Sequence, residues 1–112
     1  MADLKEIGKQ AKAARYILAG LDTNTKNKAL FTAAECLEAD AADILAENAK
    51  DLEAGRSRSM PKGLLDRLSL TQKRISDMAE GLRQVAALPD PVGEILDTLT
   101  RPNGLVISKR RV

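Results

Sequence analysis

The stretch MAEGLRQVAALPDPVGE (Met78–Glu94) decides the fold, because the spacing of its apolar residues changes within it. Before Pro89, apolar side chains recur every three or four residues, as they do on one face of a helix. The members of that face are Ile75, Met78, Leu82 and Val85. Pro89 disfavours helical geometry in the residue before it, so the helix must stop by Leu88. The stretch therefore predicts a helix, a rigid Pro-Asp-Pro break and, from Val92, a strand.

Beyond the break, residues 94–112 have the alternating pattern of two strands joined by a turn. In the turn RPNG (Arg101–Gly104), the fixed torsion of Pro102 suits the first corner, and Asn103-Gly104 tolerates positive φ. An isolated two-stranded hairpin is marginal in water, so these strands need a third strand or a helical surface. No other stretch reads as a third strand. The sequence predicts a hairpin whose partner lies elsewhere.

Upstream of the break, the pattern is helical. We expect one helix from Leu4 to Leu21 behind an Asp3 cap, and a second that is capped by Thr23 or Asn24 and runs to Gly55. We expect the second to break near Ala39, with Asp40 as a new cap, followed by a short turn over residues 61–68 and a helix capped by Thr71. The predicted fold class is mostly α with a C-terminal β-hairpin, divided into a helical segment (1–88) and a linker with hairpin (89–112).

Composition and charge exclude several classes of protein. Residues 1–55 carry a net charge of −3 and residues 56–112 a net charge of +5, but the basic residues of the second half are dispersed except in SKRR (Ser108–Arg111). Aromatic residues make up 2% of the chain. A nucleic-acid surface needs a concentrated basic stripe, usually with aromatic platforms, so nucleic acid is not an expected partner. No window is apolar enough for a membrane span, and a single cysteine without a secretory leader indicates the cytoplasm.

Few residues suggest chemistry. The sequence has no histidine and neither of the common phosphate-binding glycine motifs. Cys36 lies in the middle of a predicted helix, where a packing role is favoured over a reactive thiol. The carboxylates of ECLEADAAD (Glu35–Asp43) suit a solvated helix face better than an acid/base pair. We therefore assign no catalytic, cofactor-binding or metal-binding residue to this chain.

Asn48 is the exception among the polar residues, because it lies one helical turn after Ile44 and Leu45 and one before Leu52. A buried amide must find hydrogen-bond partners. Two interpretations stay open: the side chain pins a neighbouring loop through backbone hydrogen bonds, or it contacts a ligand. The first is favoured.

Several stretches together resemble the N-terminal quarter of the γ-glutamyl phosphate reductase family, also called glutamate-5-semialdehyde dehydrogenase. They are KNKAL (26–30), ILAENAKDLEAG (44–55), LLDRLSLT (64–71), MAEGLRQVAALPDPVGE (78–94) and RPNGLVISKRRV (101–112). Their order and spacing cover essentially the whole chain, and the fourth is the most specific.

The resemblance implies a larger α/β protein with the aldehyde dehydrogenase fold. Such an enzyme reduces γ-glutamyl phosphate to glutamate 5-semialdehyde with NADPH, in the synthesis of proline. By the same resemblance, its cysteine nucleophile and nucleotide-binding strands would lie beyond Val112, so that the chain would be truncated and inactive alone. The hairpin would belong to an oligomerisation arm, Lys109, Arg110 and Arg111 would solubilise it, and glutamate 5-kinase is a possible partner. The alternative is a free-standing helical module that binds a protein through the hairpin edge.

Overall fold

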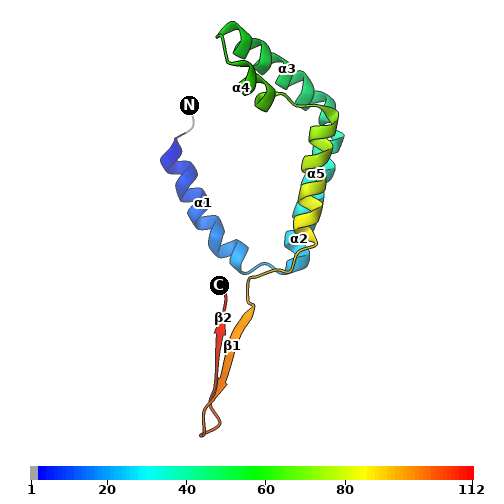
Figure 1. Cartoon of the computed structure of the whole chain (residues 1–112). Coiled ribbons are helices and arrows are strands. Elements are labelled where there is room, and N and C mark those ends of the chain that lie inside the picture. Colours follow the sequence, from blue (N-terminus) through cyan, green and yellow to red (C-terminus); the bar gives the residue numbers. More distant parts are fainter. Residues whose placement is uncertain (1–2) are drawn as a thin grey trace. The chain divides into compact units, whose positions relative to one another are not determined.

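The computed structural model describes residues 3–112, which form five helices followed by two strands (Figure 1). This order confirms a mostly α chain that ends in a β-hairpin. The residues separate into two compact units. The first joins the residues up to Lys26 with Leu88–Val112, and the second is Asn27–Ala87.

The first helix, α1 (Leu4–Ala19), is capped as expected, since the Asp3 carboxylate accepts a hydrogen bond from the Lys5 N–H at 2.9 Å. It ends at Gly20, whose N–H donates to the Ile17 carbonyl. None of its residues is buried, and Leu4 is 81% exposed. The apolar stripe of α1 therefore has no cover within the described residues.

Helix α2 (Thr23–Ala39) begins one residue earlier than the cap prediction allowed. Thr23 and Asn24 are already helical, and the capping side chain is Asp22, which accepts from the Thr25 N–H at 2.7 Å. Hydrogen bonds from the Thr25 hydroxyl and backbone lower the pKa of Asp22. The prediction of Thr23 or Asn24 as the cap is wrong because all seven residues from Asp22 to Lys28 are polar, and the pattern does not show which of them begins the helix.

The predicted break after Ala39 is confirmed, because α3 (Ala41–Ser57) is a separate helix that starts after Asp40. The Asp40 side chain makes no capping hydrogen bond. We expected Gly55 to end this helix, and that prediction is wrong. Gly55 is buried within the last turns of α3. A methyl group at Gly55 would lie 3.1 Å from Leu65 and 3.3 Å from Met60, so this glycine serves the close approach of the following loop.

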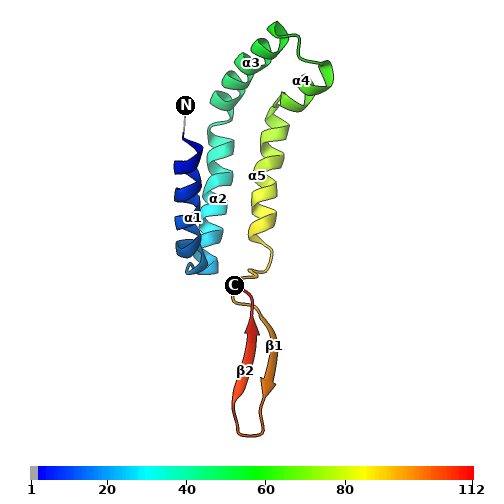
Figure 2. The same cartoon turned by 90° about the vertical axis from the view of Figure 1, so that its left-hand side faces the viewer.

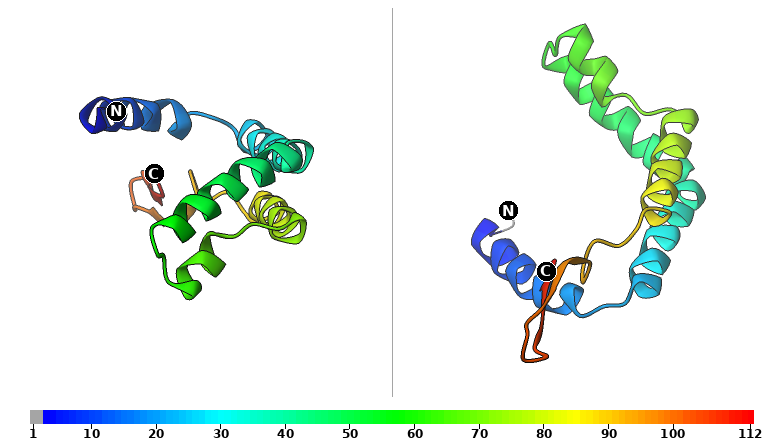
Figure 3. Two further views of the ribbon diagram at one scale, coloured as in Figure 1. Left: turned by 90° about the horizontal axis from the view of Figure 1, so that it is seen from above. Right: turned by 60° about the horizontal axis from the view of Figure 1, so that its bottom comes forward.

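Helices α4 (Lys62–Leu68) and α5 (Gln72–Ala86) follow their predicted signals. Pro61 precedes α4, and the Thr71 hydroxyl caps α5 by accepting from the Arg74 N–H at 3.1 Å. Helix α5 ends before Pro89, as the proline rule requires. Helix α4 packs against α3, and Figures 2 and 3 show the pair folded back on each other.

The core of the second unit consists mainly of small side chains. Its buried apolar residues are Ala34, Ala41, Ile75, Ala79 and Ala86. The buried face of α5 thus differs from the predicted one, since Met78 and Val85 are exposed. Arg83 of α5 makes a two-pronged contact with Glu38 of α2 at 2.6 and 3.0 Å. This pair lowers the pKa of Glu38.

The hairpin joins β1 (Ile95–Thr100) and β2 (Val106–Arg110) in an antiparallel, two-stranded sheet with a register shift between Ile95 and Asp97. Arg101 and Gly104 close the turn, since the Gly104 N–H donates to the Arg101 carbonyl at 2.9 Å. Gly104 has a φ of +89°. A turn followed by a left-handed glycine is a common three-residue hairpin loop, and it places Pro102 and Asn103 at the two corners.

Candidate functional site

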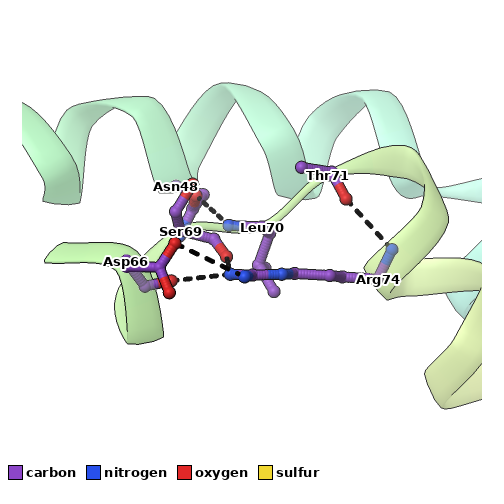
Figure 4. Close-up of polar contacts among 6 residues, drawn as sticks. All are labelled: Asn48, Asp66, Ser69, Leu70, Thr71 and Arg74. Carbon is purple, nitrogen blue, oxygen red and sulfur yellow. Dashed lines mark hydrogen bonds and ion pairs between the residues drawn. The ribbon is translucent and has the colours of Figure 1, made fainter. Parts of the chain in front are cut away.

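Asn48 connects α3 to the linker between α4 and α5 (Figure 4). Its amide nitrogen donates to the Leu68 carbonyl and its amide oxygen accepts from the Leu70 N–H, each at 2.9 Å. The residue is only 7% exposed. The structure therefore confirms the loop-pinning interpretation, and both polar ends of the side chain are engaged by the backbone.

Arg74 holds the same linker from the other side. Its guanidinium donates to the carbonyls of Asp66 and Ser69 at 2.6 and 2.5 Å, and it lies 3.6 Å from the Asp66 carboxylate (Figure 4). Together, Asn48 and Arg74 satisfy polar groups of residues 66–70 that neither helix could pair. Sequence reasoning missed Arg74, because one basic residue in the first turn of a helix carries no pattern of its own.

A groove of about 390 Å³ lies beside Asn48. Ile44 and Leu70 supply its apolar lining, and three carboxylates of α3 border it, namely Asp43, Glu47 and Asp51. Among the described residues, no group of acidic, cysteine or histidine side chains is gathered closely enough to hold a metal ion. These carboxylates therefore show no geometry that would assign them a ligand.

Cys36 lies on the exposed surface of α2, so the predicted packing role is wrong for the residues described here. It follows the fully buried Ala34 by two positions, which on a helix points it to the opposite side. Neighbouring Glu35 and Asp43 are exposed, in agreement with a solvated face. Of the residues in ECLEADAAD, Glu38 alone has a partner in another helix.

The basic end of the chain lies on the hairpin. Lys109 faces Asp97 in the register, and Arg111 forms an ion pair with Glu94 at 3.2 Å. Every residue of both strands is exposed. The basic residues therefore alternate along a ribbon, partly neutralised by facing carboxylates, and do not make a continuous cationic surface.

The hairpin itself is the candidate interaction surface. Within residues 3–112 its sheet contains two strands, so each strand has one edge without a neighbour. One face pairs Leu99 with Ile107, which are 52% and 49% exposed, and the other places Thr98 beside Ser108. An unpaired edge beside an exposed apolar pair is suited to strand addition.

In the part of the chain that the structure describes, no helix combines the length and the apolar character that a bilayer span requires.

Comparison with known proteins identifies close relatives. The chain is 54% identical over 105 residues to γ-glutamyl phosphate reductase of Moorella thermoacetica, a match that covers 94% of the chain and 25% of the relative. It is 59% identical over 102 residues to the enzyme of that name from Neisseria meningitidis, covering 91% of the chain and 24% of the relative. No protein-family model matches the chain.

A solved structure agrees with the sequence matches. The crystal structure of γ-glutamyl phosphate reductase from Thermotoga maritima superposes with a TM-score of 0.91 at 38% identity, over 96% of this chain and 26% of that one. The chain thus spans about a quarter of the length of the relatives that it matches. Sequence and structure together show that the chain is homologous to the N-terminal quarter of γ-glutamyl phosphate reductase.

Proposed function

We propose that the chain is the N-terminal part of an oxidoreductase that converts γ-glutamyl phosphate to glutamate 5-semialdehyde in proline synthesis. The observation that supports this proposal is an identity of 49–59% to γ-glutamyl phosphate reductases over nearly the whole chain. The structural similarity to the Thermotoga maritima reductase, at a TM-score of 0.91, also supports the proposal. We take NADPH as the reductant and the cytoplasm as the location on the same resemblance.

None of the residues described here is assigned to catalysis or to the cofactor. The chain lacks the glycine-rich phosphate loops, and its one cysteine lies on the outer face of α2. The role of the chain is then structural, because the chain supplies helices and a hairpin to the complete enzyme. We expect the isolated 112-residue chain to be inactive and to show no NADPH binding by calorimetry, and micromolar binding would contradict this.

A chimaera tests the proposal. The first quarter of the Neisseria meningitidis reductase is replaced by this chain, joined at the position that aligns with Val112. The assay measures reduction of NADP⁺ by glutamate 5-semialdehyde and phosphate, the reverse of the proposed reaction. We expect a rate within about tenfold of the parent enzyme, a barrier change below about 1.4 kcal/mol. The parent without its first quarter serves as the negative control.

A chimaera that folds and assembles normally but loses more than about a hundredfold in rate would refute the proposal. That result would favour the alternative, a free-standing module that binds through the hairpin edge.

We further propose that the hairpin is an assembly element through which copies of the enzyme associate. Its unpaired edges and the exposed Leu99–Ile107 pair support this role. Ile107→Asp should weaken association about a hundredfold, because a buried unpaired charge costs several kcal/mol. Ser108→Asp adds the same charge on the opposite, polar face and should change association little. Equal sedimentation of Ile107→Asp and the parent would remove the assembly role. An association with glutamate 5-kinase stays a prediction.

A further inference from the structure

The linker between α5 and β1 is attached to the first turn of α2 by a single carboxylate. Asp90 accepts a hydrogen bond from the Thr23 hydroxyl at 2.9 Å and forms an ion pair with Lys26 at 2.5 Å. Thr23 and Lys26 are three residues apart and so lie on one face of the helix. We call these three residues the Asp90 clamp. It joins positions that are 67 and 64 residues apart in the sequence.

Beyond the clamp, every residue up to the hairpin is held. The Asp90 carboxylate also accepts from the Val92 N–H at 3.0 Å. The Glu94 N–H donates to the Pro91 carbonyl at 3.2 Å, which closes a turn in which Gly93 has a φ of +84°. Proline fixes its own φ, so Pro91 contributes one rotatable backbone torsion fewer there.

The base of the hairpin continues this series of bonds. The Gly93 N–H donates to the Arg111 carbonyl at 2.8 Å, and the Arg111 N–H donates to the Glu94 carbonyl at 2.9 Å. From the first turn of α2 to the paired strands, hydrogen bonds follow one another without an unconstrained residue. The hairpin is therefore not attached through a flexible joint.

The clamp is also more sheltered than the other ion pairs among the described residues. The side chains of Lys26 and Asp90 are 24% and 17% exposed, whereas those of Lys73 and Asp77 are 83% and 63% exposed. An exposed pair of flexible side chains contributes little, while a partly buried and multiply bonded one holds its geometry. Lys26, then the Val92 N–H, then the Thr23 hydroxyl lower the pKa of Asp90 to about 2, so the carboxylate keeps its charge throughout the neutral range.

We infer that the Asp90 clamp is a positioning device that fixes the base of the hairpin to the first turn of α2. A hairpin held in one orientation meets a partner strand without first losing the freedom of a hinge, and such preorganisation strengthens association. The inference rests on the proposed assembly role of the hairpin. It adds that the efficiency of assembly depends on a side chain outside the hairpin.

The test uses the active chimaera with Asp90→Ala, which removes all three contacts, and Asp90→Asn, which keeps an acceptor for the Val92 N–H. Glu94→Gln is the matched control, since it removes one negative charge four residues away and affects only the exposed pair with Arg111. The first measurement is hydrogen exchange of the Val92 and Gly93 amides. We expect exchange about tenfold faster or more in Asp90→Ala, a smaller increase in Asp90→Asn and none in Glu94→Gln, because bonds to a charged acceptor are among the stronger ones.

The second measurement is sedimentation, in which Asp90→Ala should associate about tenfold more weakly than Glu94→Gln. Thr23→Val, which removes one hydroxyl without changing shape, should shift both measurements in the same direction and covers the case in which Asp90→Ala fails to fold. Unchanged amide exchange in Asp90→Ala would overturn the inference. Unchanged association of Asp90→Ala would also overturn it, provided that the separate variant Ile107→Asp does dissociate the enzyme. If Ile107→Asp has no effect, the assembly role fails instead, and amide exchange alone decides whether the clamp fixes the hairpin base.

Discussion

Replacing Asn48 with alanine tests how the helices of the second unit are held together. The change removes the donor to the Leu68 carbonyl and the acceptor for the Leu70 N–H. Each orphaned group costs roughly 1–2 kcal/mol at a site that is nearly buried. Alanine recovers about 0.6 kcal/mol through its better helix propensity. We therefore expect a net loss of about 1.5–3.5 kcal/mol in the free energy of unfolding.

The assay is urea unfolding followed by far-ultraviolet circular dichroism, combined with hydrogen exchange of the Leu70 amide. Asn24→Ala is the matched control, because it makes the same chemical change at an exposed position of α2 and should alter stability by less than about 0.5 kcal/mol. Asn48→Asp provides a second check. Its ionised carboxylate would face the Leu68 carbonyl, so this variant should gain stability relative to Asn48→Ala as the pH falls and the carboxyl group regains a proton to donate.

Two results would refute this reasoning. One is a loss below about 0.5 kcal/mol in Asn48→Ala with the helical content preserved, which would mean that water replaces both bonds without cost. The other is unchanged exchange of the Leu70 amide, which would mean that Asn48 does not protect it.

Four other outcomes are expected. Ile75→Ala should lower the unfolding free energy by about 2–5 kcal/mol because Ile75 is fully buried, whereas Ile17→Ala at a 69% exposed site should change it by less than about 0.5 kcal/mol in the same urea titration. Ser59→Gly should stabilise by about 0.5–1 kcal/mol in thermal unfolding, since Ser59 has a φ of 58°, and a loss would show that its side chain matters more than its backbone. Asp90 should titrate near pH 2 when its carboxyl carbon is followed by NMR. Because its folded pKa is lowered from 3.8, its contribution to stability is complete above about pH 4 and is lost as the pH falls toward 2. A titration midpoint near 3.8 would contradict the clamp. Cys36→Ala should leave the turnover of the chimaera nearly unchanged, while Cys36 in the parent chain reacts readily with a thiol reagent, and a hundredfold fall in kcat would show a role that its exposure does not suggest.

Local signals in the sequence predicted most of the elements. Asp3 and Thr71 cap helices because their short polar side chains reach the first free N–H groups, and Pro89 limits α5 because of its own ring. Gly55 misled the prediction, since a glycine at the end of a helical stripe usually marks a helix end. Here it provides space for Met60 and Leu65, a requirement that only the folded loop reveals.

For contacts that join distant segments, the sequence predicted at most the type of contact and never the partner. Asn48 was expected to bind a loop, but its position 20–22 residues before that loop could not be read from a helical pattern. The approach of Arg83 to Glu38 and of Asp90 to Thr23 depends on tertiary packing over still longer separations. The absence of catalytic residues from the chain stays a prediction, supported by the homology to one quarter of a larger enzyme.

The hairpin tip contains a site prone to deamidation, the pair Asn103-Gly104. An Asn-Gly pair ages by deamidation, in which the glycine nitrogen attacks the asparagine side-chain carbon, ammonia leaves, and hydrolysis of the resulting ring gives aspartate or isoaspartate. At the tip, the Gly104 N–H is bound to the Arg101 carbonyl, and the Asn103 side chain accepts from the Leu105 N–H at 3.1 Å. The attacking nitrogen is thus held in its own hydrogen bond while the turn is closed. Asn103 should therefore deamidate more slowly in the folded turn than the same Asn-Gly pair does in an unstructured peptide, a difference that peptide mapping of stored protein would measure.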